Sequence, residues 1–168
     1  MTRPNTIIYI LLLLACGITY TACNKTGDGR NPCLEPRRYF LVMQTCSPAD
    51  TGSAGVALKL PSPIVGYVDT NIWFADGRAA ASEFVGPLSG VVDSTRWFVI
   101  PDTNNKAAMD TIVFYYTRKP VFLSTACGYT MQYSLYDIST TLNVIDSARI
   151  EKTEVNNAND VIHVKVFY

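Results

Sequence analysis

The sequence predicts an all-β domain, an antiparallel immunoglobulin-like β-sandwich of about seven to nine strands, with a partly open β-barrel as the alternative. Two observations lead to this prediction. The chain is rich in β-branched and aromatic residues, with 15 Val, 17 Thr, 10 Tyr and 7 Phe among its 168 residues. Short apolar runs recur along it, and clusters of Gly, Pro, Asn and Asp, which favour turns, separate them.

The first half of the domain contains three runs with strand composition. Residues 38–45 form an apolar and aromatic run that is followed by a loop of small and polar residues. A second run, 56–60, ends before two prolines, which cannot donate to a sheet ladder. Residues 64–74 are predicted as one strand or as two strands broken near Asp69. Residues 78–84 form the only stretch with helical composition.

The second half of the domain has a clearer strand pattern. In the closing run, alternate residues from Ile162 to Tyr168 are apolar and are expected to face the core, whereas His163 is expected on the exposed face. The strands predicted in this half are residues 95–100, 111–118, 121–125, 127–135, 145–155 and 161–168.

The N-terminus resembles a bacterial lipoprotein signal. Its apolar run, residues 7–14, is too short for a permanent transmembrane helix, which needs roughly 20 apolar residues. Two small residues precede Cys23, and the chain becomes polar directly after it. We therefore expect Cys23 to carry the lipid, with Cys16 as the alternative.

This reading divides the chain into three parts. Residues 1–22 are the predicted signal peptide, 23–32 a flexible tether and 33–168 a single β-sandwich domain. Acyl chains on Cys23 would attach the protein to a membrane, because each buried CH₂ contributes about 0.8 kcal/mol. The predicted location is the bacterial outer membrane, on its periplasmic or cell-surface face.

The cysteine count leaves three thiols once Cys16 is cleaved off and Cys23 is lipidated. An exported chain reaches an oxidising compartment, where one disulfide is the simplest expectation. Spacing does not fix its connectivity. We expect Cys33 to pair with Cys127, which would leave Cys46 as a buried thiol.

Charge and motifs argue against several functions. Lys plus Arg and Asp plus Glu are each 14, so there is no basic excess for binding nucleic acid. The lone histidine, His163, supplies no metal or catalytic constellation, and the motifs of common hydrolases and nucleotide-binding proteins do not occur in the sequence. The sequence predicts no cofactor, no metal site and no enzymatic activity.

Aromatic residues are the main candidates for ligand contact. Trp73 lies next to a predicted Asp-Gly turn and is the candidate ligand-binding residue. For the other aromatic residues, packing in the core or across strands is the expected role. The aromatic residues weighed in this way are Trp73, Trp97, Tyr115, Tyr116, Tyr129 and Tyr133.

Several segments together resemble a family of Bacteroidota lipoproteins, the domain of unknown function 6452. The resemblance covers most of residues 33–168 and is most specific where a strand pair ends in Ala126-Cys127-Gly128. The segments that carry it are residues 93–95, 110–116, 121–128, 145–147 and the closing strand. The resemblance implies an exported, membrane-anchored β domain and supplies no catalytic residues.

These observations predict a lipid-anchored, non-catalytic binding or structural module of the bacterial envelope. Its expected partners are the membrane, through the lipid, and an envelope protein or a glycan. The alternative is a carbohydrate-binding surface lipoprotein, which predicts an exposed aromatic row with polar neighbours.

Overall fold

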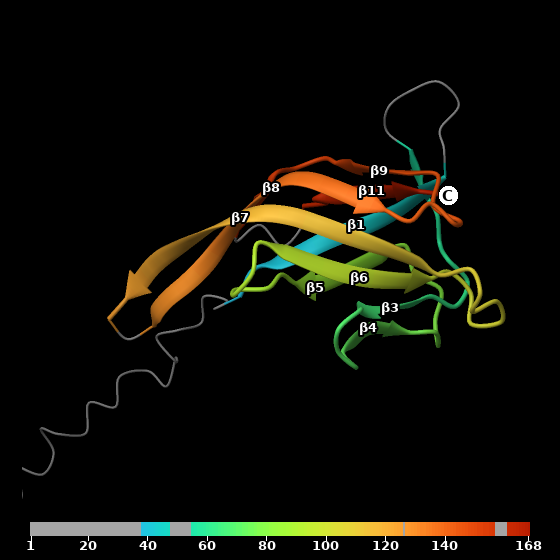
Figure 1. Cartoon of the computed structure of the whole chain (residues 1–168), viewed down its shortest axis with the longest axis horizontal. Helices are drawn as coiled ribbons and strands as arrows, with labels where there is room; N and C mark the ends of the chain where they lie inside the picture. The colour runs from blue at the N-terminus through green and yellow to red at the C-terminus, as the bar shows by residue number, and fades with distance from the viewer. Residues whose placement is uncertain (1–37, 48–54, 126, 157–160) are drawn as a thin grey trace, which may run out of the picture. The chain divides into compact units, whose positions relative to one another are not determined.

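The computed structural model describes residues 38–47, 55–125, 127–156 and 161–168. These residues form strands and turns but no helix, which confirms the predicted all-β class (Figure 1). Within the described part of the chain, no helix is long and apolar enough to cross a membrane. The predicted signal peptide and tether lie outside these residues.

The larger sheet has six strands, and each strand runs antiparallel to its neighbours. Its two longest strands, β7 and β8, form a hairpin that extends past the neighbouring strands (Figure 1). In spatial order the strands are β10 (Glu154–Val155), β8 (Gly128–Thr140), β7 (Asp110–Ser124), β6 (Ser94–Ile100), β3 (Ile64–Tyr67) and β4 (Trp73–Asp76).

The smaller sheet has five strands built around the first strand of the domain. Its central strand β1 pairs in parallel with the last strand, β11, with Met43 opposite Val164, and the other pairs are antiparallel. The strands are β2 (Val56–Ala57), β5 (Glu83–Pro87), β1 (Phe40–Ser47), β11 (Val164–Phe167) and β9 (Ser147–Ile150).

The two sheets pack face to face, as the predicted sandwich requires. In β6 and in the first half of β7, residues 110–116, every second side chain is buried, so one face of the large sheet supplies the core. Trp97 is fully buried and lies between Phe74 and Phe114, with ring centroids 4.8 and 4.9 Å away. Burial of each large apolar side chain contributes roughly 1.5–3 kcal/mol.

Two of the predicted strand boundaries differ from the structure, and in both places the pairing with neighbouring strands explains the difference. The runs at 111–118 and 121–125 form one strand, β7, despite Pro120. Beyond Tyr115 no residue of β6 pairs with β7, so the missing N–H of the proline interrupts no ladder there. The run at 145–155 forms two strands, β9 and β10, which belong to different sheets.

Residues 64–74 divide into two strands, β3 and β4, which was one of the two predicted alternatives.

The stretch with helical composition, residues 78–84, is not a helix. Glu83 and Phe84, the end of the predicted helical stretch, begin β5, which pairs with β1. Phe84 is 2% exposed, and its burial in the core outweighs the local helix propensity.

Candidate functional site

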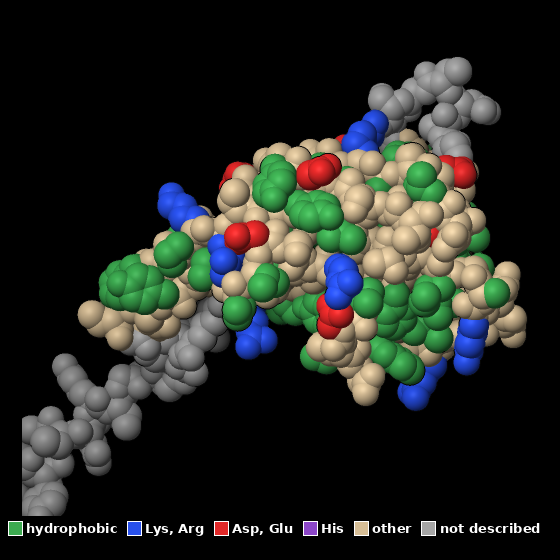
Figure 2. Space-filling model, viewed as in Figure 1, with side chains coloured by type: hydrophobic (Ala, Val, Ile, Leu, Met, Phe, Trp, Pro, Cys, Tyr) green, Lys and Arg blue, Asp and Glu red, His purple; other side chains and the backbone are tan. Residues whose placement is uncertain are grey.

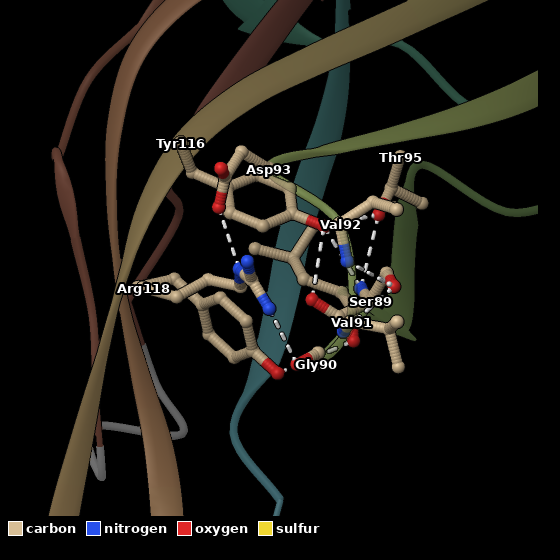
Figure 3. A network of polar contacts seen from close by, with 10 residues as sticks. Ser89, Gly90, Val91, Val92, Asp93, Thr95, Tyr116 and Arg118 are labelled. Atoms are coloured by element: carbon tan, nitrogen blue, oxygen red, sulfur yellow. Dashed lines mark hydrogen bonds and ion pairs between the residues drawn. The ribbon is translucent and has the colours of Figure 1, made fainter.

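Residues 88–93, which connect β5 to β6, form a loop held by three tyrosines, one each from β3, β7 and β8. Figure 3 shows Tyr116 and Arg118 beside this loop. The tyrosine hydroxyls donate to three consecutive backbone carbonyls at the start of this loop. Tyr67 donates to Pro87, Tyr133 to Leu88 at 3.3 Å and Tyr116 to Ser89 at 3.1 Å.

Tyr116 makes the densest contacts of the three. Its hydroxyl also accepts a hydrogen bond from the Ser89 backbone N–H at 3.0 Å and lies 2.6 Å from Thr95 Oγ1. The same Ser89 N–H donates to Thr95 Oγ1 at 3.0 Å. The Tyr116 ring meets the Tyr133 ring edge-on, with centroids 5.2 Å apart. These contacts fix both the path and the direction of the loop backbone.

The protonation state of the tyrosines suits this role. Burial, and then the neighbouring Tyr116 and Tyr133, together raise the pKa of Tyr67 to about 12. Burial also raises the pKa of Tyr116 and of Tyr133. All three hydroxyls therefore keep their protons at neutral pH and can donate to the loop carbonyls.

An ion pair holds the outer side of the same loop. Arg118 Nε lies 2.5 Å from Asp93 Oδ1, and Arg118 Nη1 donates to the Gly90 carbonyl at 2.7 Å. The tip of the loop is apolar and points into solvent, since Val91 is 82% exposed and Val92 52%. The loop therefore presents apolar side chains on a backbone that is fixed from below and from one side.

Three shallow hollows surround this loop. The largest, about 660 Å³, lies between the loop and β8 and includes Leu88, Val91 and Met131 in its lining. A second, about 550 Å³, lies between the loop and the β3–β4 turn, where Ile72 is 56% exposed. The third, about 490 Å³, lies beside Arg118. Concave apolar surface with a few charged groups at its rim is typical of binding sites.

Trp73, the candidate ligand-binding residue, lies away from these hollows on the outer face of β4. Its side chain is 55% exposed, as predicted from its place beside a turn. A Cβ at Gly66 would lie 3.0 Å from the Trp73 ring and 3.1 Å from the Phe98 ring, so the glycine allows both rings to approach the backbone. A role for Trp73 in ligand binding stays a prediction.

On the face shown in Figure 2, hydrophobic side chains gather over β3 and β4, over the middle of β7 and β8, and at the far end of the β7–β8 hairpin. The predicted aromatic set is divided by the fold. Trp97, Tyr116 and Tyr133 are buried, as the core-packing reading expected, whereas Tyr129 is 70% exposed.

His163 is not the exposed strand residue that the alternation predicted. It is 1% exposed, because β11 begins one residue later and the side chain turns into the core. Its Nδ1 accepts a hydrogen bond from the Val42 backbone N–H at 3.1 Å. Burial, and then the positive charge of Lys152, lower the pKa of His163, so the ring is neutral. Its role is structural, at the start of the β1–β11 pairing.

The cysteines divide between described and undescribed parts of the chain. Cys46 is a buried free thiol, as expected, and burial raises its pKa. Cys127 follows β7, and its backbone N–H donates to Ser124 Oγ at 3.1 Å. Cys23 and Cys33 lie outside the described residues, so lipidation and the Cys33–Cys127 pairing stay predictions.

The loop site was not found from the sequence. Tyr116 and Tyr133 are named above only as aromatic residues expected in the core, not as part of a loop site. Tyr116 and Ser89 are 27 residues apart, and Tyr133 and Leu88 are 45 apart, so no local pattern connects them. The signal that could have found it is the apolar Val91-Val92 pair directly after Gly90, in a stretch where the sequence predicts no strand.

No group of three or more His, Cys, Asp or Glu side chains that could hold a metal ion occurs among the residues described above. No curated protein and no solved structure matches the chain. Residues 63–168 match DUF6452, a family of unknown function, and the chain therefore belongs to that family.

Proposed function

We propose that this protein is a lipid-anchored lipoprotein of the bacterial outer membrane that acts as a non-catalytic binding module. Its binding surface is the 88–93 loop with the hollows on either side. The observation that carries this proposal is the exposure of Val91, Val92 and Ile72 around a loop whose backbone is held by three tyrosines. Exposed apolar side chains on a fixed backbone lose little conformational freedom on binding, which favours affinity.

The chemistry of the surface favours a protein partner with an apolar segment. The exposed side chains at its centre are aliphatic, and charged pairs lie at its edge, with Arg96 Nη2 2.5 Å from Asp69 Oδ1 and Arg118 paired with Asp93. An apolar centre with a polar rim is the usual composition of a protein–protein interface.

Site-specific photocrosslinking in cells tests the binding surface. A photoreactive residue at position 91 is expected to give a discrete heavier conjugate. Leu142, which is 58% exposed in a different connection, is the matched control and is expected to give none. Equal crosslinking from both positions, or none from position 91, would contradict the proposed surface.

The anchor is a separate part of the proposal and has its own test. Incorporation of radiolabelled palmitate is expected in the wild type and in Cys16→Ala, and its loss in Cys23→Ala. Loss in Cys16→Ala alone would assign the anchor to that residue.

The disulfide proposed between Cys33 and Cys127 is supported by the observation that Cys46 is the buried free thiol. Non-reducing peptide mapping is expected to give one linked peptide pair that contains Cys33 and Cys127. Alkylation of Cys127 in the native protein would refute the pairing.

A carbohydrate ligand at Trp73 is the second candidate. The exposed indole beside Gly66 and Phe98 favours it, because aromatic rings on an open sheet face can stack against sugar rings. Glycan-array binding that disappears in Trp73→Ala but persists in Val91→Asp would select this candidate over the loop surface.

A further inference from the structure

The end of the β7–β8 hairpin, here called the arm, consists of residues 119–124 and 128–132. Within the described residues these two segments pair only with each other. Figure 1 shows the arm extending past the neighbouring strands. A two-stranded ribbon without further strands contributes little to a core, so its exposed side chains require another explanation.

The arm carries an exposed aromatic pair. Phe122 and Tyr129 lie directly opposite each other on the two strands, with ring centroids 5.2 Å apart and planes at 60°. Phe122 is 53% exposed and Tyr129 70%. Figure 2 shows hydrophobic surface at the end of the arm. Large exposed aromatic groups of this kind mark contact surfaces.

The charge of the arm is positive. Lys119 is exposed, and neither segment of the arm contains Asp or Glu. Tyrosine places its ring at the boundary between lipid and water, and lysine extends its ammonium group toward lipid headgroups. A cation close to a membrane surface with anionic lipids contributes about 1 kcal/mol.

The described domain also begins beside the arm. Arg38, the first described residue, lines the 660 Å³ hollow together with Tyr129 and Met131. Cys23 is fifteen residues earlier in the sequence, and a fully extended chain of that length spans at most about 50 Å. The chain that leads back to Cys23 therefore joins the described domain beside the arm, and its length limits how far the arm can lie from the lipid.

We propose that the arm docks onto the lipid surface that holds the anchor. The rings of Phe122 and Tyr129 lie in the headgroup layer, and Lys119 lies against anionic headgroups. This inference rests on the proposed lipidation of Cys23. It also orients the domain, because the arm then faces the bilayer.

Protection of tyrosines in vesicles tests the docking. The lipidated full-length protein is reconstituted into vesicles of phosphatidylethanolamine and phosphatidylglycerol, isolated by flotation and iodinated with lactoperoxidase, which acts on water-exposed tyrosines. Tyr136, which is 63% exposed on the same strand as Tyr129, is the internal control. We expect Tyr129 to be iodinated several-fold more slowly than Tyr136 in vesicles, and Lys119→Glu to bring the two rates together.

A second readout uses positions matched for exposure. Phe122→Trp and Val85→Trp, both at positions that are 53% exposed, are made in a Trp73→Phe background. Brominated phospholipids are expected to quench the added fluorescence of the Phe122→Trp variant and to leave that of Val85→Trp unchanged.

The outcomes separate the two levels of the proposal. Protein that floats with vesicles but shows equal iodination of the two tyrosines, or equal quenching of the two variants, would overturn the docking and leave the anchor intact. Protein that carries no lipid and does not float would overturn the anchor, and the docking with it.

Discussion

Two loops that cross between the sheets are held in chemically different ways. The 88–93 loop, which connects β5 to β6, receives hydrogen bonds from neutral tyrosine hydroxyls. In the connection from β8 to β9, residues 141–146, the segment 141–145 instead donates to one buried carboxylate, Asp110. Both solutions satisfy backbone groups that would otherwise lack partners, as buried polar groups require.

Asp110 is fully buried and accepts four hydrogen bonds. They come from Thr141 Oγ1 at 2.6 Å and from the backbone N–H groups of Asn143, Val144 and Ile145 at 2.7, 2.8 and 2.9 Å. Burial alone raises the pKa of the carboxyl, but these hydrogen bonds outweigh it, and the pKa falls below its ordinary value. The comparison teaches that one loop depends on a buried charge, whereas the buried contacts of the other are made by neutral hydroxyls and its ion pair, Arg118 with Asp93, lies on the outer side.

Removal of the charged acceptor is expected to have the largest effect on stability. Asp110→Ala leaves three buried or half-buried backbone N–H groups and one hydroxyl without their acceptor, which costs about 3–5 kcal/mol. Urea unfolding followed by circular dichroism measures the change. Asp146→Ala, an exposed carboxylate next to the same loop, serves as the control and should change stability by less than about 0.5 kcal/mol. Equal effects of the two variants would contradict the role of Asp110.

Removal of one tyrosine hydroxyl is expected to have a smaller effect. Tyr116→Phe keeps the ring in the core but loses the contacts to Ser89 and Thr95, at a cost of about 1–3 kcal/mol. Tyr136→Phe removes an exposed hydroxyl and should be near neutral. If Tyr116→Phe unfolds at the same urea concentration as the wild type, the hydroxyl does not hold the loop.

Acid should distinguish the two loops directly. Because the folded pKa of Asp110 is lowered, its contribution is fully present above about pH 4 and is lost as the pH falls below that value. The free energy of unfolding of the wild type should therefore fall between pH 6 and pH 2.5. Tyr116→Phe should show the same fall, because Asp110 is intact in that variant. In Asp110→Asn the fall in stability with acid should be smaller. A fall as large as that of the wild type would show that other carboxylates are responsible.

His163 gives the smallest expected effect, in a different pH range. Its lowered pKa means that the unfolded chain binds a proton before the folded one does as the pH falls. Stability is therefore full above about pH 6.5 and declines gradually below it. Unfolding at pH 7.5 and at pH 5.5 should differ in the wild type and differ less in His163→Gln. A larger difference in the variant would assign the decline elsewhere.

The sequence predicts the strands much better than it predicts the site. Alternation identifies β6 and β7 because each has one face in the core. It fails for β5, where the preceding residues favour a helix and the pairing with β1 decides. It also fails for His163, because the alternation was extended three residues before the start of β11.

The candidate site depends on contacts that no local pattern contains. The three tyrosines that hold the 88–93 loop come from three different strands and meet only after both sheets have formed. Trp73 was identified as exposed because its turn is a local signal, whereas the burial of Trp97 follows from its register in β6.

The parallel pairing of β1 with β11 has a consequence for how the molecule comes into being. The contacts of His163 with Val42 join positions 121 residues apart, and the last strand is also the partner of the first. A nascent chain on the ribosome therefore cannot complete the small sheet until Phe167 has been synthesised and has left the exit tunnel. Contacts at such long range slow folding, and truncation before Val164 would leave β1 without this neighbour.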